Sequence, residues 1–245
     1  MEEWYLGGLI IHRSWFESRS RNQEDNYNYP QIFCILSIMV FPVRDEPAIA
    51  GLEQSQDLFL RIGSGFDFEK VSGEIHDNEK EALVGIVVTT MRDLIEDTGM
   101  LLSSLGVCVE EGSGVASLRA FWDPKDRNRL VSGIIVYKTA YLSALIEKLN
   151  TEKDFLNMAE LSVMQTTAHE MYHFKGAKRR PRRWKRTAKL VTDLNGVEDP
   201  REELAADMYS LRYMSQKVQA NPRRYPSGYT FLRNLRRQIR SQKKR

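Results

Sequence analysis

Cysteine is scarce in this chain, with Cys34 and Cys108 the only two among 245 residues. Two cysteines are too few for the disulfide framework of a small secreted protein. The chain begins Met1-Glu2-Glu3 and lacks the basic segment that opens a secretion signal. We therefore expect a cytoplasmic protein that is held together by a hydrophobic core, which a chain of this length and 42% hydrophobic content can build.

Long hydrophobic runs are also lacking. The segment that comes nearest, residues 32–43, is about a dozen residues long and contains Pro42, whereas a membrane-spanning helix needs about 20 apolar residues. This segment instead predicts a buried strand, with Cys34 as a small core side chain. We expect no association with a membrane.

Histidine is equally rare, yet two of the four histidines lie within five residues, in the run His169-Glu170-Met171-Tyr172-His173. Apolar residues around this run recur at the spacing of a helix: Leu161, Val163, Met164, Ala168 and Met171. Residues four apart share a helix face, so both imidazoles can bind one metal ion with Glu170 beside it. The pattern HExxH is typical of zinc hydrolases, although it also arises by chance, and a catalytic zinc needs a third protein ligand.

A second helix is predicted over residues 199–218. Asp199 is a good N-cap, and Pro200 suits the first helical position. Glu203 and Asp207 are four apart and share a face, and the alanines between them are small enough to let another helix approach closely. The competing interpretation is that both carboxylates are solvated and interact only with the helix dipole.

The order HExxH followed downstream by E-x-x-A-D resembles the gluzincin metalloproteases, in particular the small minigluzincin and ImmA/IrrE-like proteins. This resemblance implies that His169, His173 and Glu203 bind one Zn²⁺ per chain. It also implies that Glu170 is the general base and that Asp207 orients one ligand histidine through a hydrogen bond. Glu202 is the alternative third ligand if the correspondence is shifted by one residue.

Two other zinc-protease patterns fail on this sequence. Metzincins require a further histidine at the position where this chain has Arg179, and arginine offers no lone pair to zinc. SprT-like proteases require a third histidine downstream of HExxH, and none follows His173. The gluzincin pattern is therefore the one that the residues fit.

The resemblance implies a zinc metalloendopeptidase that hydrolyses a peptide or protein substrate. In such a site zinc lowers the pKa of a bound water to about 7, and Glu170 takes its proton. One alternative is a non-proteolytic protein that contains zinc and binds nucleic acid or has a regulatory role, using the basic loop at residues 175–189 and the basic C-terminal tail. Another is a latent protease, in which the segment after Asn221 covers the cleft and is anchored by Tyr225, Tyr229 and Phe231.

The order of predicted elements indicates an α+β fold. Helical patterns cover residues 78–97 and 139–149, and strand patterns cover residues 106–110, 115–121 and 132–138. We expect a gluzincin-like domain over residues 76–220, in which a mixed or mostly antiparallel sheet packs on the HExxH helix. Residues 1–75 are predicted to form an accessory, β-rich region with strands at 4–11, 32–43 and 57–62, and residues 221–245 a basic tail.

One strand is a candidate for binding substrate. An exposed strand beside the active-site helix can take an extended peptide as an additional strand, because backbone hydrogen bonds supply affinity for any sequence. The candidate residues are Gly133, Ile134, Ile135, Val136 and Tyr137. The alternative is a core strand that makes no contact with substrate.

The net charge of +3 conceals an asymmetry. Residues 1–168 hold 15 Lys and Arg against 26 Asp and Glu, a balance of −11, whereas residues 169–245 hold 21 against 7, a balance of +14. A basic cluster with an interleaved tryptophan is typical of a surface that binds nucleic acid or an acidic partner, and also of a solvated loop. The candidate contact residues are Arg179, Arg180, Arg182, Arg183, Trp184, Lys185 and Arg186.

Overall fold

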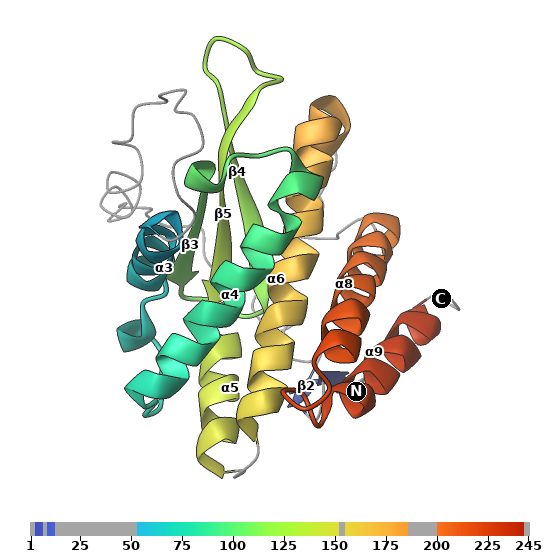
Figure 1. Cartoon of the computed structure of the whole chain (residues 1–245). Coiled ribbons are helices and arrows are strands. Elements are labelled where there is room, and N and C mark those ends of the chain that lie inside the picture. The colour runs from blue at the N-terminus through green and yellow to red at the C-terminus, as the bar shows by residue number, and fades with distance from the viewer. Residues whose placement is uncertain (1–2, 7–8, 13–52, 152–154, 186–199, 243–245) are drawn as a thin grey trace, which may run out of the picture.

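A computed structural model describes residues 3–6, 9–12, 53–151, 155–185 and 200–242 (Figure 1). The elements in chain order are β1 (Glu3–Leu6), β2 (Leu9–His12), α3 (Glu53–Gly65), α4 (Asp77–Thr98), β3 (Leu105–Glu110), β4 (Ala116–Trp122), β5 (Leu130–Lys138), α5 (Thr139–Thr151), α6 (Phe155–Arg179), α8 (Pro200–Ala220) and α9 (Gly228–Gln242). The fold is α+β, as the sequence predicts. The helices and strands expected between residues 78 and 218 are all present, with ends shifted by a few residues.

The main sheet has three strands in the order β3-β5-β4. β5 lies in the centre, parallel to β3 and antiparallel to β4, so the sheet is mixed. α4 and α6 lie side by side over one face of this sheet (Figure 1). Ile135 and Tyr137 of β5 belong to the main core, while Ile134 and Val136 form a smaller cluster with Cys108, as the alternation of side chains along a strand requires.

The central position of β5 corrects the prediction for the substrate strand. Both edges of residues 133–137 are hydrogen-bonded, to β3 on one side and to β4 on the other. A strand paired on both edges has no backbone groups left for a peptide, so the assignment of Gly133, Ile134, Ile135, Val136 and Tyr137 to substrate binding is wrong. Among the residues that the structure describes, nothing pairs with the outer edge of β4.

The N-terminal region differs from the β-rich expectation. Residues 57–62, predicted as a strand, belong to helix α3, because the side chains that enter the core are Leu58 and Ile62, which are four apart. Leu60 between them is 64% exposed, so the apolar run follows the helical period and not the alternation of a strand. Residues 4–11 contribute to two short paired strands, β1 and β2. The strand predicted at residues 32–43 lies outside the described residues.

The C-terminal segment, expected as a basic tail, forms helix α9 over residues 228–242. Its inner face is buried in the main core through Phe231, Leu232, Leu235 and Ile239, and it contacts α8 and α6. Tyr225, one of the three anchors in the latent-protease hypothesis, is also buried there. α9 is therefore a core helix, and its removal would expose the core.

One hydrophobic cluster contains side chains from Leu58 to Ile239. Side chains of α3 and α9 therefore pack in the same core as the elements between them. The domain boundaries expected at residues 75 and 220 stay predictions. No helix in the described ranges has the length and apolar character that crossing a bilayer demands.

Gly133 sets the distance between the sheet and the HExxH helix. A Cβ atom added at this residue would lie 1.5 Å from Cε1 of Phe174, the residue that follows His173. Phe174 is fully buried and has little space to move into. The absence of a side chain in the central strand thus allows α6 to approach the sheet beside the site.

We predict that Gly133→Ala lowers the free energy of unfolding by about 1–3 kcal/mol, because the added methyl group overpacks the core against Phe174. Chemical denaturation measures this loss. Gly85→Ala in α4 is the matched control: the nearest atom to its Cβ would be 3.9 Å away, and alanine favours a helix over glycine. Equal stability of Gly133→Ala and the wild type would contradict the close approach.

Candidate metal centre

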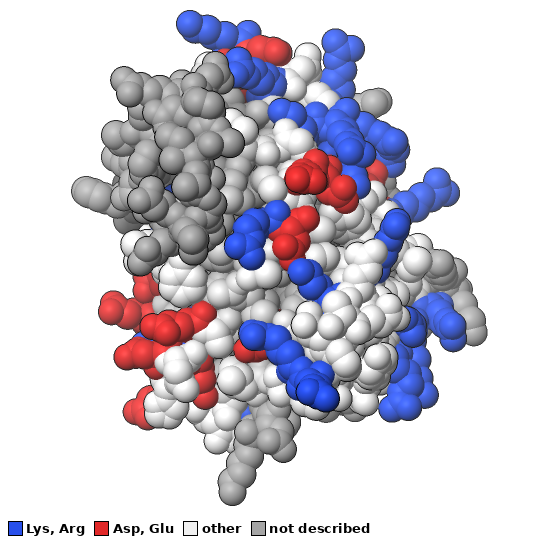
Figure 2. All heavy atoms as spheres, in the orientation of Figure 1, with Lys and Arg blue, Asp and Glu red and all other residues white. Residues whose placement is uncertain are grey.

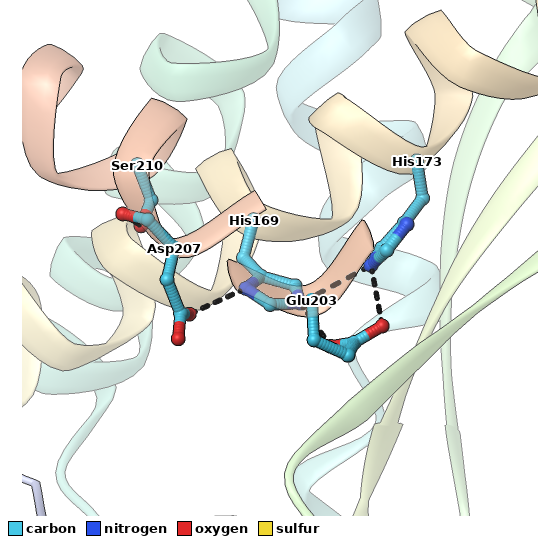
Figure 3. A network of polar contacts seen from close by, with 5 residues as sticks. All are labelled: His169, His173, Glu203, Asp207 and Ser210. Atoms are coloured by element: carbon cyan, nitrogen blue, oxygen red, sulfur yellow. Dashed lines mark hydrogen bonds and ion pairs between the residues drawn. The ribbon is translucent and has the colours of Figure 1, made fainter. Parts of the chain in front are cut away.

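Helix α6 brings His169 and His173 to one face, as the spacing of four predicts. Their Nε2 atoms lie 3.2 Å apart (Figure 3). The opposite side of the helix is fixed in the core by Ala168, Met171 and Phe174, each fully buried. The two imidazoles are therefore held by a rigid element, which a metal site requires.

Helix α8 supplies the carboxylate that completes the group. Glu203 Oε2 lies 3.0 Å from His169 Nε2, and Glu203 Oε1 lies 3.3 Å from His173 Nε2. Ala206, one turn along, is fully buried and leaves room for α8 to approach α6. Glu203 is also in the first turn of α8, where the helix dipole favours negative charge.

Asp207 holds His169 in the orientation that a ligand needs. Its Oδ1 lies 2.9 Å from His169 Nδ1 (Figure 3). An Nδ1–H that donates to this carboxylate leaves Nε2 with a lone pair, directed at the point where His173 and Glu203 converge. The predicted roles of Asp207 and Glu203 are thus consistent with the positions that the structure gives them.

The group His169, His173 and Glu203 can hold a metal ion. Ligand atoms of a tetrahedral zinc centre lie about 3.3 Å apart, because Zn–N and Zn–O distances are about 2.0–2.1 Å. The observed separations of 3.0, 3.2 and 3.3 Å are close to this spacing, with the first and last measured to different oxygens of Glu203, and one ligand atom from each residue lies within 4.8 Å of the others. The lone pair of His169 Nε2 faces a carboxylate oxygen of Glu203, and the two repel each other. A proton or a metal ion between them removes this repulsion.

The close approach of these side chains shifts the pKa values of His169 and Glu203. Burial lowers the pKa of His169, but the hydrogen bonds to Asp207 and Glu203 outweigh burial and hold it well above its ordinary value. Burial likewise raises the pKa of the Glu203 carboxyl, yet the two imidazoles hold it far below its ordinary value. The site therefore attracts positive charge strongly, whether as protons or as a metal ion.

Glu170 is next to the ligands without being one of them. It is 5% exposed, and burial raises the pKa of its carboxyl. It lines the same cavity as the three ligands. No hydrogen bond from another described residue engages its carboxylate, so this buried acid has no evident structural partner there.

The ligands lie in a cavity of about 750 Å³. Its walls come from α6, from the N-terminal turns of α8, from α9 and from the residues at the start of β4. The last two walls were not predicted from the sequence: they are residues 113–118 on the β4 side, and Leu235, Gln238 and Gln242 on α9. The β4 sequence does carry a signal, since the alternation of polar and apolar residues over residues 116–120 is typical of a strand with one solvated face.

Some residues of the predicted basic cluster line the cavity and others do not. Arg179, Arg180, Arg183 and Trp184 line the cavity beyond the C-terminal half of α6. Arg182 is exposed and does not line it. Arg186 lies outside the described residues.

Two members of the cluster are engaged in local contacts. Lys185 donates to the backbone carbonyl of Arg127, and its Nζ lies 3.9 Å from the ring centre of Trp122. Arg183 forms an ion pair with Glu202 at 2.6 Å. Glu202 is thereby engaged by an arginine, and the described residues that can share a metal ion are His169, His173 and Glu203.

Two tyrosines of α8 could donate to a developing oxyanion, but both are engaged by α4. Tyr209 donates to Asp97 at 2.9 Å and Tyr213 donates to Asp93 at 2.7 Å, on the side of α8 that faces α4. Neither lines the cavity. His76 is the N-cap residue of α4, and His12 is in β2.

Comparison with known proteins adds nothing to this geometry: no family model, curated protein or solved structure matches the chain. The chemistry of the site is therefore inferred from the arrangement of its own residues.

We predict that Asp207→Asn weakens metal binding about 10- to 100-fold, the usual effect of removing a carboxylate that orients a ligand histidine. Competition with a chromogenic zinc chelator measures the affinity. Asp93→Asn is the matched control, since Asp93 also bonds to α8, through Tyr213, but does not touch a ligand. Equal affinities in both variants would contradict the orienting role of Asp207.

Proposed function

We propose that this protein is a zinc-dependent metallopeptidase of the gluzincin type. One observation carries the proposal: two histidines of one helix and a glutamate of the next converge within 3.3 Å, beside a buried carboxylate that has no structural partner among the described residues. The order of a helix, three strands, a helix, the HExxH helix and the glutamate helix supports it.

Zinc is the metal that this donor set favours for hydrolysis. Magnesium and calcium prefer sites made of oxygen atoms, whereas imidazole suits zinc and other transition metals. Two histidines and a carboxylate can also hold iron(II) in oxygenases. The adjacent Glu170 favours zinc, because a hydrolase needs a base beside the metal and an oxygenase does not.

A purely structural metal is less consistent with these residues. Structural zinc sites have four protein ligands, whereas catalytic sites have three and leave one position open. Within the described residues, the ligand group has three members, His169, His173 and Glu203. Burying Glu170 in addition costs free energy, which a structural role would not recover.

The chain's own residues account for the proton transfers. Bound zinc would supply a water of lowered pKa and would polarise the substrate carbonyl. Glu170 accepts the proton from the attacking water and returns it to the leaving nitrogen of the peptide. Asp207 keeps the Nδ1 proton of His169, so that Nε2 stays available as a ligand. The core contacts of α6 hold Glu170 and the histidines in position throughout.

The walls of the cavity suit an extended peptide. The outer edge of β4 has no partner strand in the described part of the chain, and residues 113–118 line the same cavity as the ligands. A peptide added to this edge would gain backbone hydrogen bonds that do not depend on its sequence. We therefore propose that the substrate binds along the outer edge of β4, and not along β5.

We predict that Glu170→Gln binds zinc like the wild type but does not cleave peptides, because the amide has nearly the same shape and cannot accept the proton. Zinc content and the cleavage of unfolded casein measure the two properties. Glu202→Gln is the control, since it removes a neighbouring carboxylate that pairs with Arg183, and it should retain activity. Substantial cleavage by Glu170→Gln would refute the mechanism.

A further inference from the structure

The outer surface of α8 and α9 is cationic. Residues 200–242 include nine Lys and Arg and three Asp and Glu. All three acidic residues, Glu202, Glu203 and Asp207, line the metal cavity, so the remainder of the two helices has no acidic residue. Figure 2 shows Lys and Arg along the side where α8 and α9 lie, while Asp and Glu gather at the opposite lower side, near the start of α4.

Four arginines form a stripe on α9. Arg233, Arg236, Arg237 and Arg240 are spaced by three and four residues, so they share one helix face. All four are exposed, and no acidic residue within the described ranges forms an ion pair with any of them. The inner face of α9 is buried in the core. Apart from a long hydrogen bond of 3.5 Å that Arg236 donates to Ser215 Oγ on α8, the stripe makes no polar contact with the described part of the fold.

An exposed aromatic residue extends this stripe. Tyr229 is 58% exposed and lies one helical turn before Arg233, on the same face. An exposed aromatic ring among arginines is the arrangement on which proteins stack the bases of single strands. From Tyr229 to Arg240 the stripe is about 17 Å long, so it can contact several consecutive phosphates of one strand.

We propose that this α9 stripe, made of Tyr229, Arg233, Arg236, Arg237 and Arg240, binds single-stranded nucleic acid. The arginines contact phosphates and Tyr229 stacks on a base. Nucleic acid fits better than a membrane surface, because a helix that lies in a membrane inserts its apolar face, and the apolar face of α9 is buried in the core. It fits better than an acidic protein because planar guanidinium groups match phosphate and the ring adds a contact for bases.

The stripe is separate from the metal cavity. Leu235, Gln238 and Gln242 of α9 line the cavity, and at 100° per residue the arginines lie on the opposite side of the same helix. The proposed contact uses no metal ligand. It therefore goes beyond the metallopeptidase proposal and can hold or fail independently of it.

The test measures binding of a fluorescein-labelled oligothymidylate by anisotropy, over a series of salt concentrations. The stripe variant carries Arg233→Ser, Arg236→Ser, Arg237→Ser and Arg240→Ser in the full chain. The matched control carries four substitutions of exposed cations elsewhere, Arg92→Ser, Lys125→Ser, Arg127→Ser and Arg129→Ser, and so has the same net charge. Thermal melts verify that both variants are folded.

Each lost phosphate contact reduces the slope of log K against log salt concentration by about 0.7 for a single strand. We expect the slope of the stripe variant to fall by about 3 and that of the control by much less. Tyr229→Leu should weaken binding about fivefold or more with the slope unchanged, since stacking does not release counterions.

Three results would overturn the proposal. The first is equal loss of binding in the stripe variant and in the control, which would indicate attraction by net charge alone. The second is wild-type protein that does not bind the oligonucleotide at low salt. The third is binding to phosphatidylserine vesicles or to polyglutamate in place of the oligonucleotide. Peptidase activity is measured separately, so failure here leaves the metallopeptidase proposal standing.

Discussion

The contact between α6 and α8 is the interaction on which the site depends, because each helix supplies two of the four polar residues. α4 fixes the rotation of α8 in this contact. Asp93 and Asp97, four apart on α4, accept hydrogen bonds from Tyr213 and Tyr209, which are four apart on α8. With the tyrosines facing α4, the acidic side of α8 faces the histidines of α6. A sliding or rotation of α8 would separate Glu203 and Asp207 from His169.

Electrostatics explains why this contact needs a cation. Glu170, Glu203 and Asp207 bring three carboxylates together with two imidazoles in a largely buried region. Such a group is costly when charged and uncompensated. A divalent ion on His169, His173 and Glu203 would balance most of this charge, which links metal binding to the stability of the α6–α8 contact. The cationic surface of α8 and α9 lies outside this cavity and requires a different explanation.

The sequence predicts the site better than its surroundings. The four polar residues are each four positions apart on their helices, a local relation that helical geometry alone determines. The order of strands is not local, so the central position of β5 could not be obtained in this way, although its continuous apolar run favours a strand covered on both faces. The same limit applies to α9, whose arginines suggest a tail until Phe231, Leu232, Leu235 and Ile239 are seen to be buried.

The most direct test of the central claim is the metal content of the purified protein, measured by elemental analysis after supply of zinc, for the wild type, Glu203→Gln and Glu202→Gln. We expect one zinc per chain in the wild type and in Glu202→Gln, and little or none in Glu203→Gln. The two variants remove adjacent carboxylates of one helix turn, so a difference between them identifies the ligand. A wild type without zinc, or equal zinc content in both variants, would contradict the three-ligand site.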